Sequence, residues 1–105
     1  MYVTITRFKV SPDIGEAGLT ALFEQSAERY AKVAGLLAKH YYIDEGNEAG
    51  GVYLWESRAD ADALFDEAFA QGILQRFGSR PSVHTMWCPV SLDNVHHSVR
   101  LAPQR

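Results

Sequence analysis

The pattern of apolar and polar positions divides the chain into short alternating stretches and longer periodic ones. The short stretches have the length and residue types of β-strands. They cover residues 2–10, 36–44, 49–57 and 80–88. Within the third, residues 52–55 read Val-Tyr-Leu-Trp and leave no polar side for water. This strand is therefore expected at the centre of a sheet, covered on both faces.

The longer stretches carry apolar residues at spacings of three and four, which predicts two amphipathic helices. The first covers residues 11–35 and closes at a glycine suited to a left-handed helix end. The second follows Ser57, which with Asp60 forms a predicted capping box. Gly72 is expected to weaken or break this helix, and Gly78 to end it.

The resulting order, strand–helix–strand–strand–helix–strand, predicts an α+β fold of the ferredoxin-like βαββαβ type. It has a four-stranded antiparallel sheet with the first and third strands central and the helices on one face. The other face is also rich in apolar side chains, which are costly to leave in water. We therefore expect a homodimer in which two sheets form one barrel. Residues 1–94 form this domain, and residues 95–105 a tail that is disordered or straps the partner.

Composition narrows the class of protein. The chain of 105 residues has a formal net charge of −3 and a pI near 5.7, which gives no footprint for nucleic acid or an anionic membrane. It lacks the long apolar run of a signal peptide or membrane span. The lone Cys88 excludes an intrachain disulfide and fits a reducing cytoplasm.

Residues 48–57, Glu-Ala-Gly-Gly-Val-Tyr-Leu-Trp-Glu-Ser, preceded by Gly35-Leu36-Leu37 and Lys39, resemble the mono-oxygenases of the YdhR type. These belong to the dimeric α+β barrel superfamily and are similar to antibiotic-biosynthesis mono-oxygenases. The resemblance covers residues 1–94 and implies a pocket between sheet and helices. It also implies a cofactor-independent mono-oxygenase acting on a small aromatic, phenolic or quinol-like substrate. The chain departs from the family at His40, where an aromatic residue is common, and in its tail.

Such an enzyme removes a proton from the substrate and leaves an electron-rich anion that reduces dioxygen itself. That chemistry needs a base with a pKa near neutral, hydrogen-bond donors and an aromatic-walled cavity. His40 is the predicted base because of its intrinsic pKa, with Tyr53 and Trp55 as further catalytic candidates. The predicted substrate-binding residues on the strands are Arg7, Tyr41, Tyr42, His84 and Trp87.

Structural readings of the same residues stay open. Aromatic residues favour strands and need no ligand to explain them, and a lone histidine is often a packing residue. Arg7 can pair with an acid such as Glu56, and Lys39 can extend to the surface or the dimer edge. An isomerase or cyclase without oxygen chemistry, or a non-catalytic dimeric small-molecule-binding protein, therefore remains an alternative.

No metal or cofactor is expected. The four histidines lack the HxH or HxxxH spacing of a metal site. Haem enzymes of this superfamily use a second-helix histidine and a first-strand asparagine. Both are missing from the corresponding segments here. There is also no glycine-rich nucleotide motif.

Overall fold

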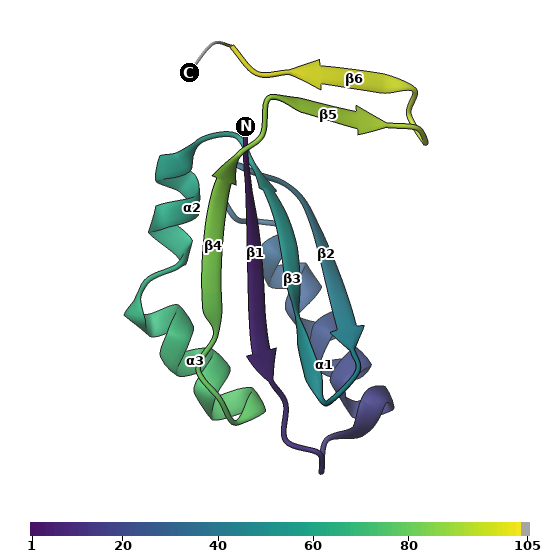
Figure 1. The fold of residues 1–105 in the computed structure, drawn as a ribbon, viewed down its shortest axis with the longest axis vertical. Coiled ribbons are helices and arrows are strands. Elements are labelled where there is room, and N and C mark those ends of the chain that lie inside the picture. The colour runs from purple at the N-terminus through teal and green to yellow at the C-terminus, as the bar shows by residue number, and fades with distance from the viewer. Residues whose placement is uncertain (104–105) are drawn as a thin grey trace.

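The computed structural model describes residues 1–103 as a four-stranded antiparallel sheet with three helices, followed by a two-stranded hairpin (Figure 1). The elements are β1 (Tyr2–Lys9), α1 (Gly15–Tyr30), β2 (Leu36–Asp44), β3 (Glu48–Trp55), α2 (Arg58–Leu64), α3 (Glu67–Phe77), β4 (Ser82–Trp87), β5 (Val90–Asp93) and β6 (Ser98–Leu101). The predicted α+β, ferredoxin-like fold is confirmed.

The strand order is β2-β3-β1-β4, so the first and third strands are central as predicted. Burial alternates along β1: Thr4, Thr6 and Phe8 are buried, whereas Ile5 and Arg7 are exposed. The buried positions point toward the helices. We call this side of the sheet the helix-covered face and the other side the open face.

Two groups of buried side chains hold the helices on the sheet. At one end Phe77 of α3 stacks on Phe8 of β1, with ring centroids 4.7 Å apart, and contacts Phe23 of α1. At the other end Trp55 and Tyr53 of β3 pack beneath α2. Offset and edge-on aromatic pairs of this kind stabilise a core beyond the area they bury.

The helix boundaries differ from the sequence-based prediction. Helix α1 begins at Gly15 without a side-chain cap and ends at Tyr30, before the left-handed Gly35. The second predicted helix is two helices, and the break lies at residues 65–66 instead of Gly72. The reason is Asp66, whose carboxylate accepts a hydrogen bond from the Phe69 amide at 2.9 Å and starts a new helix.

Two predicted helix ends are confirmed. Ser57 caps α2, because its hydroxyl oxygen accepts a hydrogen bond from the Asp60 amide at 3.1 Å. Gly78 ends α3 in a left-handed conformation, with a φ of 103°.

Strand β2 contains a bulge that changes which residues share a face. Leu36 pairs with Trp55, whereas Ala38 pairs with Leu54, the next residue along β3 toward its start. Leu37 is therefore an extra residue, and Leu36 lies on the helix-covered face while Ala38 lies on the open face. Simple alternation along a regular strand would place Leu36 and Ala38 on the same face.

The C-terminal hairpin of β5 and β6 extends beyond the end of the sheet (Figure 1). Its strands pair with each other from Val90–Leu101 to Asp93–Ser98, and apolar side chains such as Leu92 remain 62% exposed. Strand β6 lies in the predicted tail, whose last residues, 104–105, fall outside the described residues. Within residues 1–103, no helix has the length and hydropathy needed to cross a membrane.

Candidate functional site

A cavity of about 250 Å³ lies between the helix-covered face and helices α1 and α3. Strands β1, β2 and β3 form its floor, and side chains from both core groups contribute to its walls. Its lining residues are Thr6, Phe8, Leu22, Phe23, Gln25, Ser26, Arg29, Tyr30, Lys39, Tyr41, Gly50, Gly51, Tyr53, Ile73, Arg76 and Phe77. The interior therefore combines aromatic walls with a few polar groups, as ligand sites commonly do.

The amine of Lys39 lies among three tyrosine rings. Its nitrogen is 3.3 Å from the ring centroid of Tyr30, 4.0 Å from that of Tyr41 and 4.6 Å from that of Tyr53. Strand pairing places Lys39 directly opposite Tyr53, and helix α1 supplies Tyr30 from above the sheet. The prediction that Lys39 extends to the surface or a dimer edge is wrong, because the aromatic rings accommodate its side chain in the interior.

Burial, together with the smaller effect of the positive charges of Arg29 and Arg76, lowers the pKa of Lys39 to about 7. Desolvation disfavours the ammonium form, since a cation loses its water on entering an apolar cavity. At neutral pH, a substantial fraction of the Lys39 side chain is thus the free amine, which can accept a proton.

Tyr53 and Tyr30 retain their protons at neutral pH and can donate hydrogen bonds. Tyr53 is 2% exposed, and burial raises its pKa well above the usual range. Burial also raises the pKa of Tyr30. The Ser26 hydroxyl donates to the carbonyl of Phe23 at 3.0 Å and lies 2.7 Å from the Tyr41 hydroxyl, so Tyr41 is the donor to Ser26.

Gly51 leaves space on the cavity floor. A β-carbon at this position would stand 2.9 Å from the Tyr53 ring and 3.2 Å from the Lys39 Cε. Its backbone amide donates to the Thr6 hydroxyl at 3.0 Å. The side chains of Lys39 and Tyr53 therefore occupy their positions because residue 51 has none.

Some predicted site residues lie on the helix-covered face. Tyr41 and Tyr53 line the cavity. Trp55 does not: it is 0% exposed, packed beneath α2, and its indole N–H has no hydrogen-bond acceptor among the described residues. Trp87 lies opposite Tyr2 at the far end of this face, also outside the cavity lining.

Four other predicted site residues lie on the open face. His40 pairs opposite Val52 and is exposed, and His84 pairs opposite Ile5 and is exposed. The prediction that they line the helix-side pocket is wrong. Successive residues of a strand point to opposite faces, and Lys39 takes the inward position next to His40.

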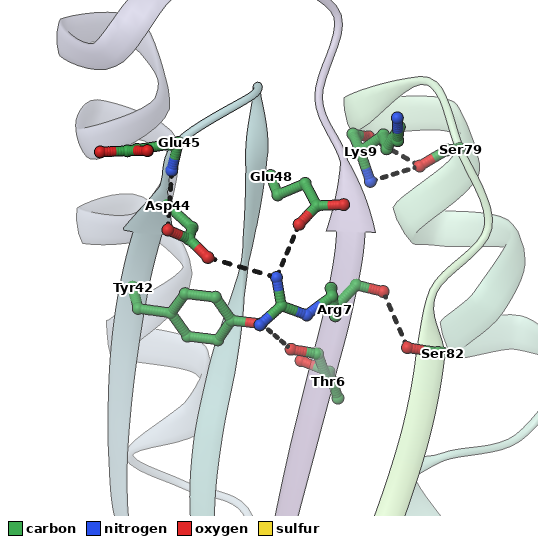
Figure 2. Close-up of polar contacts among 9 residues, drawn as sticks. All are labelled: Thr6, Arg7, Lys9, Tyr42, Asp44, Glu45, Glu48, Ser79 and Ser82. Carbon is green, nitrogen blue, oxygen red and sulfur yellow. Dashed lines mark hydrogen bonds and ion pairs between the residues drawn. The ribbon is translucent and has the colours of Figure 1, made fainter.

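Arg7 and Tyr42, the other two, form a charged network on the open face (Figure 2). The Arg7 guanidinium donates to Glu48 at 2.6 Å and to Asp44 at 3.3 Å, and it lies 5.6 Å from the centroid of the Tyr42 ring. The Tyr42 hydroxyl donates to the Thr6 carbonyl at 2.7 Å. The hydrogen bonds to Glu48 and Asp44 raise the pKa of Arg7. The acids that pair with Arg7 are therefore Glu48 and Asp44, and the predicted pairing with Glu56 is wrong.

Sequence reasoning missed Lys39, Arg29 and Arg76, although one signal was present. Alternation puts Lys39 on the same face as Tyr41, and β3 supplies Tyr53 opposite it. A lysine between two aromatic residues on the covered face of a sheet is a candidate site residue for that reason.

Fold and cavity define a ferredoxin-like α+β protein with an aromatic-walled, basic site beneath its helices. Among the described residues, no group of three or more histidine, cysteine, aspartate or glutamate side chains could hold a metal ion. The family model described as putative mono-oxygenase ydhR matches residues 5–88. This match covers most of the chain, which therefore belongs to the ydhR family.

Solved structures share the fold. A putative antibiotic biosynthesis monooxygenase from Deinococcus radiodurans has a TM-score of 0.68 at 14% identity, covering 89% of this chain and 97% of that chain. A mutant of SnoaB, a cofactor-independent oxygenase from Streptomyces nogalater, has a TM-score of 0.61 at 17% identity, covering 87% and 95%. No curated protein matches the sequence.

Proposed function

We propose that this protein is a cofactor-independent mono-oxygenase that acts on a small aromatic, phenolic or quinol-like substrate in the helix-side cavity. One observation carries the proposal: the Lys39 amine lies in an aromatic-walled cavity, 3.3 Å from the Tyr30 ring centroid, with its pKa lowered to about 7 by burial. Family membership and the likeness to an oxygenase fold support it.

In the proposed reaction, Lys39 accepts a proton from an acidic hydroxyl or CH group of the substrate. The anion that remains is electron-rich and transfers electrons to dioxygen, which forms a bond to a ring carbon. Lys39 returns the proton to the peroxide, and loss of water from the resulting hydroperoxide, with the hydrogen of the same ring carbon, leaves a carbonyl group. One oxygen atom thus enters the product and the other leaves as water, and the substrate itself is the reductant.

The tyrosines have a supporting role in this proposal. Tyr53 remains protonated at neutral pH, since burial raises its pKa, and can donate to the developing oxyanion. Tyr41 is held by Ser26 at 2.7 Å, which orients its hydroxyl at the cavity wall. His40, the base expected from sequence, lies on the open face, so the proposal assigns the base to Lys39.

The test is oxygen consumption by metal-stripped protein with a panel of hydroquinones and polyphenols. We expect enzyme-dependent uptake that falls by roughly 100-fold or more in Lys39→Met, the usual range for loss of a general base. Lys32→Met is the matched control, because Lys32 is exposed and outside the cavity lining. His40→Ala should retain turnover, and loss of uptake there would return the base to His40.

Two outcomes contradict the proposal. Uptake that persists unchanged in Lys39→Met would remove the lysine from the mechanism. The second outcome is exchange of substrate hydrogen for deuterium that requires Lys39 but proceeds without oxygen consumption. This result would favour an isomerase or cyclase that uses the same base.

We further propose that two copies pair through their open faces to form a homodimer. Apolar side chains of the sheet lie partly exposed there, including Val3, Ile5, Val52 and Leu54. The hairpin borders the same face around a groove of about 490 Å³. A second copy would remove this apolar surface from water, and the hairpin strands would gain a neighbour.

The dimer is tested by light scattering after size-exclusion chromatography. Wild type should have twice the chain mass. Ile5→Glu should be monomeric and folded, because a charge at the centre of a paired face is costly to bury. Glu24→Lys, on the exposed side of α1, is the charge-changing control. A monomeric wild type would contradict the proposal.

A further inference from the structure

Three basic side chains converge on the helix-side cavity, and no acidic side chain lines it within residues 1–103. Arg29 comes from the last turn of α1, Arg76 from the last turn of α3, and Lys39 from β2. Neither arginine forms an ion pair with a carboxylate among the described residues. The site therefore holds concentrated positive charge in a chain whose formal net charge is −3.

The two arginines also line a second, neighbouring hollow. An outer hollow of about 370 Å³ between the helices shares Arg29, Tyr30 and Arg76 with the inner cavity. Asp66 is the one acid among the described residues that line this hollow, and its carboxylate caps α3 by accepting a hydrogen bond from the Phe69 amide. A molecule that enters the cavity from this hollow passes both guanidinium groups.

Three of the four other arginines in the described part of the chain have acidic partners, and only Arg100 on the exposed C-terminal hairpin has none. Arg7 pairs with Glu48, Arg80 pairs with Glu67 at 2.9 Å, and Arg58 pairs with Asp62 at 3.7 Å. The chain thus supplies counter-ions elsewhere. Three basic groups placed together without a counter-ion raise the electrostatic energy of the empty site. An anionic ligand would offset that cost.

We propose that Arg29 and Arg76 bind an anionic oxygen of the ligand, and that the site selects aromatic molecules carrying a carboxylate or an ionised phenol. This inference rests on the proposed function for its location and names the substrate class. A planar guanidinium matches a carboxylate in two parallel hydrogen bonds, and tyrosine rings can stack on an aromatic body.

The size of the cavity limits the ligand. At about 250 Å³, it lies below the roughly 300–1,000 Å³ typical of pockets for drug-sized molecules. One aromatic ring or two fused rings suit this space. The anionic oxygen would lie toward Arg29 and Arg76, and the ring would lie among Tyr30, Tyr41 and Tyr53.

The same arrangement couples binding to proton transfer. The charged and titratable groups around Lys39 are Arg29 and Tyr30 of α1, Tyr41 of β2, Tyr53 of β3 and Arg76 of α3. A bound anion would offset the repulsion from the two arginines. Lys39 would then accept a proton more readily with the ligand present than without it.

The test compares two ligands of equal shape and different charge, 2-naphthoate and 2-naphthamide, by calorimetry without oxygen. We expect wild type to bind 2-naphthoate at least roughly tenfold more tightly, a preference that weakens with salt. The Arg29→Gln/Arg76→Gln double variant should reduce the ratio to near one. Arg58→Gln, which alters an exposed pair on α2, should keep it.

Further arms keep the result interpretable. The Arg29→Lys/Arg76→Lys variant retains both charges and should preserve much of the preference, even if the glutamine variant fails to fold by circular dichroism. The absorbance of 2-naphthol in the site would report whether an ionised phenol is bound as well as a carboxylate. A ratio near one in wild type, no saturable binding of either naphthalene, or a ratio that survives the double glutamine substitution would each overturn the proposal.

The result is separable from the proposed oxygenase activity, because binding is measured without oxygen. Preference for the anion together with absent oxygen uptake would leave the anion site standing and contradict only the oxygenase. Oxygen uptake without a preference for the anionic ligand would support the oxygenase and contradict only the anion site.

Discussion

The two faces of the sheet differ in whether their arginines have carboxylate partners. On the open face, Arg7 has two carboxylates within 3.3 Å, from Glu48 and Asp44 (Figure 2). On the helix-covered face, Arg29 and Arg76 approach a lysine and have no carboxylate partner among the described residues. The first arrangement is complete within the chain. The second would gain an anionic partner only from a bound ligand. This difference in charge pairing locates the candidate site better than residue type does.

The faces also differ in packing. Phe8, Phe23 and Phe77 form a tight aromatic cluster beneath the helices. Ile5 on the open face remains 39% exposed. In the isolated chain, stability should therefore depend mainly on the helix-covered face, and the open face should matter chiefly for association.

The largest expected effect is on folding. Phe77→Ala should lower the free energy of unfolding by about 3–5 kcal/mol, because it removes a ring that is 5% exposed and stacked on Phe8. Ile5→Ala should cost about 1 kcal/mol or less at low concentration, where the chain is monomeric. Urea denaturation followed by circular dichroism measures both. Equal costs for the two substitutions would contradict the contrast between the faces.

A smaller stabilising effect is expected from Lys39→Met. Replacing a buried amine by an apolar side chain of similar length should raise the free energy of unfolding at pH 7 by about 1 kcal/mol. The variant should lose turnover at the same time, since the amine is the proposed base. Denaturation of Lys32→Met, an exposed position, controls for loss of a positive charge.

The pH dependence of this effect has a definite sign. The pKa of Lys39 is about 7 in the folded protein and 10.5 ordinarily, so above pH 7 the unfolded chain binds more protons. Wild-type stability relative to Lys39→Met should therefore rise between pH 7 and pH 9, below the ionisation of exposed tyrosines. A difference that is constant over this range would mean that Lys39 keeps an ordinary pKa.

Arg76→Gln should raise the pKa of Lys39, because it removes one of the two charges that oppose protonation of the amine. The shift should be incomplete, since burial is the larger cause and remains. Nuclear magnetic resonance of the lysine side chain, titrated from pH 6 to pH 10, measures it. A fall in the pKa would contradict the electrostatic account of the site.

The smallest effect is expected on the open face. Arg7→Gln should destabilise the chain only slightly, and the effect should disappear at high salt, because the ion pairs with Glu48 and Asp44 are exposed to solvent. Denaturation at low and high salt measures this. A large, salt-independent loss would show that the network supports the fold in another way.

The fold was predictable because its main signals are local. Alternating strands, the Ser57 cap and the terminal glycine at residue 78 are read from neighbouring residues. The Asp66 cap was missed because the apolar stripe continues through it. The bulge at Leu37 was missed because an extra residue leaves no mark in composition.

The site was only partly predictable. The position of Tyr41 and Tyr53 at the helix-side cavity was predictable because aromatic residues stand out on a strand, whereas their predicted roles stay predictions. Lys39 was missed because a long charged side chain usually reaches water, and its burial depends on rings from separate elements. Arg29 and Arg76 meet only when α1 and α3 pack on the same sheet. Such a convergence is a tertiary property.

The bare backbone at Gly51 gives the site a simple route to new specificity. A single nucleotide change from a glycine to an alanine codon would place a methyl group 2.9 Å from Tyr53 and 3.2 Å from the Lys39 Cε. The helix-side cavity would narrow, and the Lys39 side chain would have to shift at the same time. One codon change at residue 51 would therefore alter the space for a ligand in this cavity, with no insertion in the helices or their connections.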